Sequence, residues 1–109
     1  MAYDELLAGR VRAGLADRSS ISERKMFGGL AFILAGNMCC CLTDRGLMVR
    51  VGPDAYEDAL VLPHAGPMNM TGRPMRGWVL VVLEGLAGDD GLAEWVCRGA
   101  DFAATLPAK

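Results

Sequence analysis

Three of the four cysteines in this sequence are consecutive, Cys39, Cys40 and Cys41, and the fourth is Cys97. A group of thiols can hold a soft metal ion or carry redox chemistry, with Cys97 or the single histidine, His64, as a further ligand. However, the sequence has no C-x-x-C pair, and adjacent cysteines cannot close an ordinary disulfide loop. We therefore expect no metal and no cofactor, and interpret the cysteines as small buried residues of a reducing compartment. In an extended strand, Cys39 and Cys41 would share one face and Cys40 would lie on the other.

Motifs for enzymatic chemistry are missing from the sequence. His64 has no serine or cysteine partner at a recognisable catalytic spacing, and neither a nucleophile elbow nor a zinc-binding H-E-x-x-H helix is present. The acidic residues gather at the expected starts of helices, where the helix dipole explains them. Gly28, Gly29 and Gly36 form no phosphate-binding loop. We expect a protein that is not an enzyme, and we interpret Gly28 and Gly29 as a strand entrance that needs close backbone packing.

The arginines are the remaining chemical candidates. Arg50 and Arg76 are expected on the less apolar side of a sheet, where guanidinium groups bind anions in a bidentate manner. No aromatic pair alternates with these arginines, and the net charge of −2 lacks the positive excess that binding to nucleic acid requires. We do not expect direct binding to DNA or RNA. The candidate residues for binding a partner or an anion are Phe27, Gly28, Gly29, Arg50, Arg73, Arg76 and Trp78.

The elements that must position these residues follow from hydrophobic periodicity. Apolar residues recur every three or four positions over 3–17, with Leu6 and Leu7 among them, and predict an amphipathic first helix. Residues 19–23 break this pattern and are expected to form a capped turn. Three apolar runs separated by short turn signals then predict a three-stranded antiparallel meander over 27–51.

The second half of the chain predicts two more helices and one or two strands. Pro53 is expected at the start of a short helix that ends near residue 60. Residues 63–74 are proline-rich and predict an ordered loop with an extended piece at 68–70. Residues 76–83 predict a long strand, and 88–106 a final amphipathic helix. The predicted class is α+β, with helices packed on an antiparallel sheet.

Both faces of the extended segments at 27–34 and 78–83 are apolar. Because three short helices cover one sheet face more easily than two, we expect a homodimer that buries the other face. The alternative from a different class is a small-molecule or anion-binding domain, enzymatic or not. It would use the loop Pro63–Met75 with His64 and the sheet arginines.

The chain has 109 residues, of which 52% are hydrophobic, and this is enough for one domain spanning 1–109 to bury a core without a disulfide or a metal. The longest apolar runs, 30–35 and 78–83, are far shorter than the roughly 20 residues that span a bilayer. The acidic N-terminal residues differ from a signal peptide. We expect a cytoplasmic protein without membrane association.

Several segments, taken together and in order, resemble the TfoX N-terminal domain family over about 3–107. They are Lys25-Met26-Phe27-Gly28-Gly29-Leu30-Ala31-Phe32, Met48-Val49-Arg50-Val51-Gly52-Pro53, Met68 and Gly72-Arg73-Pro74-Met75-Arg76-Gly77-Trp78-Val79. The resemblance implies the order helix, three strands, helix, two strands, helix, similar to type III secretion chaperones, and makes 68–70 a strand.

The same resemblance carries an expectation about function. Full-length bacterial members are regulators of natural competence, thought to act with the cyclic-AMP receptor protein at promoters of DNA-uptake genes, and they carry a second, C-terminal domain. The family contributes no catalytic residues. We expect a standalone, non-enzymatic domain that binds a protein partner such as a transcription regulator.

Overall fold

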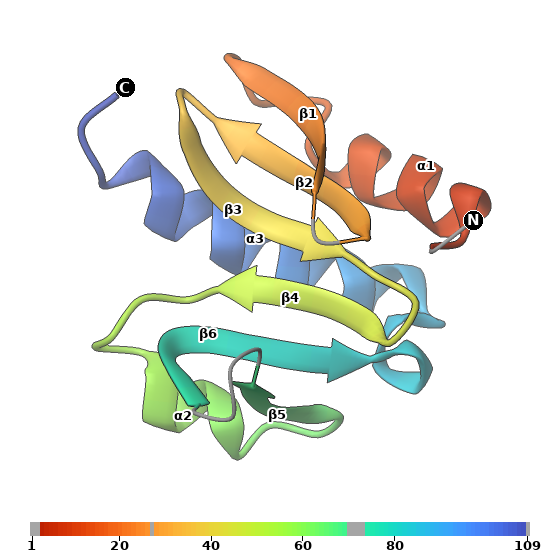
Figure 1. The fold of residues 1–109 in the computed structure, drawn as a ribbon, viewed down its shortest axis with the longest axis vertical. Coiled ribbons are helices and arrows are strands. Elements are labelled where there is room, and N and C mark those ends of the chain that lie inside the picture. The colour runs from red at the N-terminus through yellow and green to blue at the C-terminus, as the bar shows by residue number, and fades with distance from the viewer. Residues whose placement is uncertain (1–2, 27, 70–73, 109) are drawn as a thin grey trace.

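A computed structural model describes residues 3–26, 28–69 and 74–108. Its centre is a six-stranded antiparallel sheet with the strand order β1-β2-β3-β4-β6-β5 (Figure 1). The strands are β1 (Ile21–Met26), β2 (Gly29–Leu34), β3 (Asn37–Leu42), β4 (Gly46–Arg50), β5 (Ala65–Asn69) and β6 (Pro74–Val82). The helices are α1 (Glu5–Gly14), α2 (Tyr56–Leu60) and α3 (Asp89–Ala104), with a 3-10 turn, η1 (Leu83–Leu86), between β6 and α3. The predicted α+β class is confirmed.

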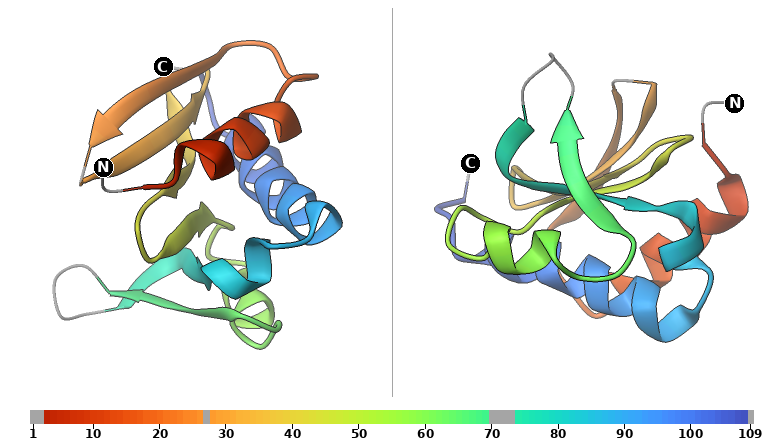
Figure 2. Two further views of the ribbon diagram at one scale, coloured as in Figure 1. Left: turned by 90° about the vertical axis from the view of Figure 1, so that its right-hand side faces the viewer. Right: turned by 90° about the horizontal axis from the view of Figure 1, so that it is seen from below.

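The three α-helices lie on one side of the sheet, as Figures 1 and 2 show together. Helix α3 packs across β3 and β4, α1 packs on α3, and α2 packs on β6 and β5. The hairpins β1-β2 and β5-β6 both bend away from the helices, so the opposite face of the sheet is concave (Figure 2). We call this second side the open face, since no helix of the described residues covers it.

The main core fills the space between the helices and the sheet. Leu7 and Val11 of α1 meet Trp95 and Val96 of α3 in this core, in agreement with their predicted helical spacing. Leu6, assigned by the same spacing to the buried side, is 82% exposed instead, because α1 presents only a narrow stripe to the core.

The side chains of β2 and β4 alternate between the two faces of the sheet. Leu30 and Phe32 of β2 lie in the main core with Leu47 and Val49 of β4, whereas Ala31 faces the other way. The alternation gives both faces of the central strands apolar side chains, so the sheet carries a second, smaller apolar cluster on its open face.

The capped turn expected at 19–23 is wrong, because Ile21–Met26 forms the edge strand β1. This strand pairs with β2 from Ile21 opposite Leu34 to Met26 opposite Gly29. Its four central residues are exposed and polar or charged, so it has neither the alternation nor the hydrophobicity that signals a strand. Pairing with β2 stabilises it, and its charges suit an exposed sheet edge.

The predicted faces of the three consecutive cysteines are also wrong. Phe32 pairs with Cys40 but Ile33 pairs with Met38, so Cys39 is an extra residue in a β-bulge. As a result, Cys39 and Cys40 both lie in the main core, and Cys41 lies in the open-face cluster. Strict alternation fails here because the bulge shifts the register by one residue.

Two boundaries in the second half differ from the predictions. Pro53 lies in a turn, and α2 begins only at Tyr56. The segment expected as a loop with a short extended piece contains a full strand, β5, which forms the outer edge beside β6. Met70, the last residue of the predicted extended piece, lies outside the described residues. Within the described part of the chain, no helix is long and apolar enough to cross a membrane.

Candidate functional site

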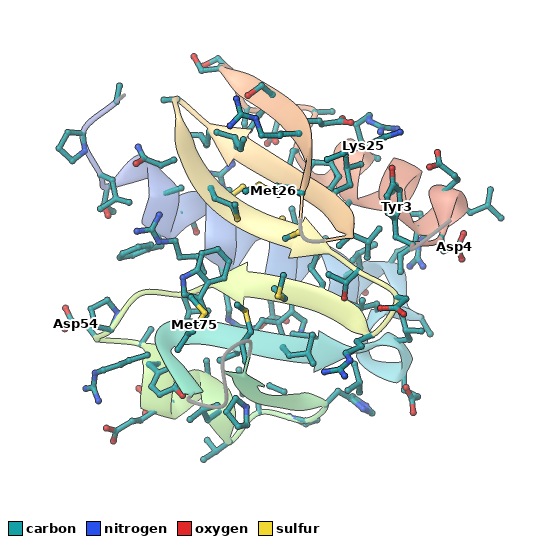
Figure 3. The ribbon with its side chains drawn as sticks, viewed as in Figure 1. Tyr3, Asp4, Lys25, Met26, Asp54 and Met75 are labelled. Atoms are coloured by element: carbon teal, nitrogen blue, oxygen red, sulfur yellow. The ribbon has the colours of Figure 1, made fainter. Side chains whose placement is uncertain are left out.

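The open face gathers an unusual share of the sulfur in this protein. Five of the seven methionines belong to its cluster. Figure 3 shows sulfur atoms along the middle of this face, between the labelled Met26 and Met75. The open-face cluster consists of buried Ala31, Cys41, Met48 and Met68, with half-buried Met26, Met38, Met75, Trp78 and Leu80 packed against them.

Cross-strand register explains how these residues meet. Cys41 of β3 lies directly opposite Met48 of β4, and Met48 lies directly opposite Leu80 of β6. Side chains at directly opposite positions on one face are contact neighbours, with Cβ atoms about 4.5–5.5 Å apart. Cys41 is 0%, Met68 4% and Met48 7% exposed. The centre of the cluster is therefore shielded from water, and the half-buried residues form its rim.

The thiol of Cys41 is unreactive in this environment. Burial raises its pKa to about 11, so it is protonated at neutral pH. In the main core, the hydrogen bond with Cys39, followed by burial, raises the pKa of Cys40. Cys39 donates a hydrogen bond from Sγ to the carbonyl oxygen of Phe32 at 3.2 Å. Cys97, on α3, is exposed.

The interpretation of the cysteines as small buried residues fits Cys39, Cys40 and Cys41. It is wrong for Cys97, which is exposed. Among the residues that the structure describes, no group of three or more His, Cys, Asp or Glu side chains is arranged to hold a metal ion. The donors gathered on the open face are instead thioethers and one thiol.

Two of the predicted site residues, Arg50 and Trp78, come together at one end of the open face. They are directly opposite each other on β4 and β6, and the guanidinium carbon of Arg50 lies 5.9 Å from the Trp78 ring centroid. The same carbon lies 5.5 Å from the ring of Phe102 on α3. No aromatic pair alternates with the arginines in the sequence, but the fold brings aromatic neighbours to Arg50 from elements distant in sequence.

Arg76 does not share a face with Arg50, contrary to the prediction. Gly77 has a φ of 95° and its carbonyl oxygen accepts hydrogen bonds from the backbone N–H groups of both Val51 and Gly52. This left-handed residue interrupts the alternation of β6. The Arg76 guanidinium therefore lies toward α2, where it contacts the Tyr56 ring at 6.0 Å and pairs with Glu57 at 3.8 Å.

Of the two glycines, Gly29 shows the close backbone packing that the sequence context predicted. Gly28 lies in the turn between β1 and β2 with a φ of 72°, and it is exposed. Gly29 is buried, and a Cβ atom there would lie 2.2 Å from the carbonyl oxygen of Leu42. The remaining candidates, Phe27 and Arg73, lie outside the described residues.

His64 lies in the turn before β5, exposed and with a φ of 69°. Its carbonyl oxygen accepts a hydrogen bond from the backbone N–H of Val82 at 3.0 Å, and its Cβ atom lies close to Gly85 of η1. These contacts give the residue a backbone role. The small-molecule site predicted around this loop would combine His64 with Arg73 or Arg76. Arg73 lies outside the described residues, and Arg76 lies toward α2.

A pocket of about 510 Å³ lies elsewhere, between α2 and the C-terminal half of α3. Its lining residues are Val51, Ala55, Asp58, Ala59, Leu62, Arg98, Asp101, Phe102 and Thr105. Two of its charges are already paired within the chain, Arg98 with Glu94 and Asp101 with Arg18, both at 2.6 Å. The sequence carries no signal for this pocket, because its walls come from helices about 40 residues apart that meet only after folding.

Comparison with known proteins gives one match. The family model for the TfoX N-terminal domain matches residues 13–103, which run from within α1 to near the end of α3. No curated protein and no solved structure matches the chain.

Proposed function

Because the chain belongs to the TfoX N-terminal domain family, we propose that it is a non-enzymatic regulatory domain that acts by binding a protein partner. The observation that carries the proposal is the open face, an apolar sheet surface that the three helices leave uncovered. Methionines make such a surface adaptable, since the unbranched thioether chain repacks easily around a partner.

The shape of the open face favours a convex partner. The sheet curves so that β1-β2 and β5-β6 stand forward of β3 and β4 (Figure 2). Six strands spaced about 4.8 Å apart give a face roughly 24 Å wide, wider than the 10–12 Å of one α-helix. Two concave faces would meet at their rims first, whereas a helix reaches the centre. We therefore propose an amphipathic helix of a partner protein as the occupant.

The charged residues on the open face further restrict the kind of partner. Arg24 and Arg50 occupy open-face positions on β1 and β4, and no acidic residue lies at an open-face position of the described strands. An apolar helix flanked by Asp or Glu would pair with both arginines, which would orient it and speed its association. A transcription regulator with such a helix fits this description.

The test uses a display library of amphipathic helical peptides with acidic flanks, and wild-type protein labelled with ¹³C at the methionine methyl groups. We expect binding to shift the methyl signals of open-face methionines. Leu80→Asp and Arg50→Glu should abolish binding, while Asp58→Asn in the α2–α3 pocket should leave it unchanged. Peptides that fail to bind, or that bind equally to Leu80→Asp, would overturn the proposal.

The homodimer expected from the sequence is a second proposal for the same face. Its flat footprint of roughly 24 by 18 Å is small beside the roughly 800 Å² per partner of a standard interface, so self-association should be weak. Sedimentation velocity at rising concentration tests it: Leu80→Asp should remove any dimer that uses this face, and a wild-type monomer throughout would exclude it.

The α2–α3 pocket supports a small-molecule function as the other candidate. Its volume of about 510 Å³ lies within the range of ligand sites, and apolar walls with a few polar groups are typical of them. A thermal-shift screen of amphipathic metabolites would test it, since a ligand at 100 times its Kd adds about 2.7 kcal/mol of stability. Ala59→Leu should fill the pocket and cancel the shift.

A further inference from the structure

Asp58 is the one charged residue lining the α2–α3 pocket for which the described part of the chain supplies no ion pair. The other two charged lining residues already have partners, Arg98 in Glu94 and Asp101 in Arg18. Asp58 is exposed at the end of the pocket formed by α2. The pocket therefore offers a single unpaired carboxylate to a ligand.

The C-terminal end of α3 adds to the negative potential at this pocket. The last turn of the helix contains no basic residue. The free carbonyl groups at the end of a helix carry about half a negative elementary charge and attract cations. Phe102 lies in this last turn and Thr105 directly follows the helix, and both line the pocket. A cation bound there would be stabilised by the end of α3 as well as by Asp58.

The interior of the pocket is apolar. Val51 is 6% and Ala59 4% exposed, and Leu62 and Phe102 are half-buried beside them. Hydrocarbon groups that move from water onto such a surface are stabilised in proportion to the area they bury. The ligand that fits this pocket combines an apolar body with one positive charge.

The Phe102 wall is held in place by its neighbours. Gly52 has a φ of 87°, and the Phe102 ring packs so closely on it that a Cβ atom at Gly52 would overlap the ring. The guanidinium carbon of Arg50 lies 5.5 Å from the centroid of the same ring, although Arg50 itself does not line the pocket. A wall that is already ordered lowers the entropic cost of binding a ligand.

An anionic ligand fits this pocket poorly. Arg98 is the only basic residue among the described lining residues, and it pairs with Glu94 at 2.6 Å. Its guanidinium carbon also lies 4.7 Å from the Trp95 ring. An anion would have to compete with Glu94 for Arg98 and would lie near Asp58 and Asp101. Placing like charges side by side is unfavourable, so the pocket discriminates against anions.

We propose that the α2–α3 pocket binds a primary amine with an apolar body, such as an alkyl or arylalkyl amine. This inference rests on the small-molecule function proposed above for the pocket, and it names the class of ligand. The ammonium group lies at Asp58, and the apolar body packs on Val51, Ala59 and Phe102. Binding is non-covalent.

The experiment compares three probes that share a phenylethyl group, namely phenethylamine, phenethyl alcohol and hydrocinnamate. Each is titrated at about pH 7 into the full chain labelled with ¹³C at the leucine and valine methyl groups. At this pH the amine is protonated and the carboxylate is ionised. We expect the amine to give saturable shifts of the Val51 and Leu62 methyl signals. It should bind at least about 10-fold more tightly than the carboxylate.

Two neighbouring acidic residues provide matched variants. Asp58→Asn removes the charge from the pocket and keeps the shape of the side chain, whereas Asp54→Asn removes an exposed charge that does not line the pocket. We expect Asp58→Asn to bind the amine about 5-fold more weakly, as for an ion pair at a protein surface, and to bind the alcohol as before. Asp54→Asn should behave as the wild type. Circular dichroism and thermal melts establish that both variants are folded.

Three results would overturn the inference. In the first, the alcohol or the carboxylate binds as tightly as the amine. In the second, Asp58→Asn binds the amine as tightly as the wild type does. Either result would leave the pocket with a small-molecule function that has no preference for a cation. In the third, the amine leaves the Val51 and Leu62 signals unchanged. If the thermal-shift screen then also finds no ligand, the small-molecule function itself fails.

Discussion

The guanidinium group of Arg50 contacts two aromatic rings, with its central carbon 5.9 Å from the centroid of the Trp78 ring on β6 and 5.5 Å from that of Phe102 on α3. Trp78 belongs to the open-face cluster, whereas α3 lies on the helical side. Arg50 therefore links the two sides of the sheet at its end. A charged side chain in this position packs on apolar surface and keeps a cation–π contact with each ring.

This relationship predicts that Arg50 contributes to stability through its planar group. We expect Arg50→Ala to lower the free energy of unfolding by about 0.5–1 kcal/mol, in the range of partly exposed cation–π contacts. Arg50→Lys should retain only part of that free energy, because an ammonium group does not stack. Urea denaturation measures both, with Arg24→Ala on the exposed edge strand as the control. Equal stability of all three variants would contradict the prediction.

Gly29 and Gly9 form a matched pair for testing backbone packing. A Cβ atom at Gly29 would lie 2.2 Å from the carbonyl oxygen of Leu42, so Gly29→Ala must displace β2 from β3. We expect a loss of about 2 kcal/mol or more. At Gly9, within α1, nothing lies within 4 Å of the added atom, so Gly9→Ala should add roughly 1 kcal/mol through helix propensity. A lower melting temperature for Gly29→Ala and a higher one for Gly9→Ala would verify both expectations.

The pair formed by Arg12 of α1 and Glu23 of β1 predicts a dependence on acid pH. The hydrogen bond from Arg12, with 2.8 Å between its Nη2 and Oε1 of Glu23, lowers the pKa of the Glu23 carboxyl group. A lowered pKa means that this stabilisation is present above the unfolded-state pKa and is lost as the pH falls through the folded-state value. The melting temperature of Glu23→Gln should therefore be lower than that of the wild type near pH 7, and the two should be equal near about pH 3. A gap that persists in acid would show that the ion pair is not its cause.

The cysteines should differ clearly in their rates of alkylation. Cys97 is exposed, whereas Cys41 is buried with its pKa raised to about 11. We expect iodoacetamide at about pH 8 to modify Cys97 rapidly and the other three only after unfolding, since the thiolate is the nucleophile. Mass spectrometry of tryptic peptides gives the alkylation rates.

Because the pKa of Cys41 is raised, its contribution to stability is lost as the pH rises from about 8.5 toward about 11.

Much of the fold is encoded locally and could be predicted from the sequence. The spacing of Leu92, Trp95 and Val96 places α3 on the sheet, and the alternation of Leu47 and Val49 defines the inner face of β4. These signals depend only on the helical or extended period of the chain, so they can be read without knowing which elements pack together. The same holds for the family resemblance, which the match over 13–103 confirms.

Only the tertiary structure decided which residues share a surface. The polar strand β1 forms because β2 offers a partner edge, and the bulge at Cys39 and the left-handed Gly77 change which side chains share a face. The open-face cluster draws on all six strands, and the α2–α3 pocket lies between two helices. No local pattern in the sequence indicates that these elements meet. The sequence therefore determined the elements and their apolar faces through local periodicity. The register between distant strands, a non-local property of the folded chain, determined the candidate sites.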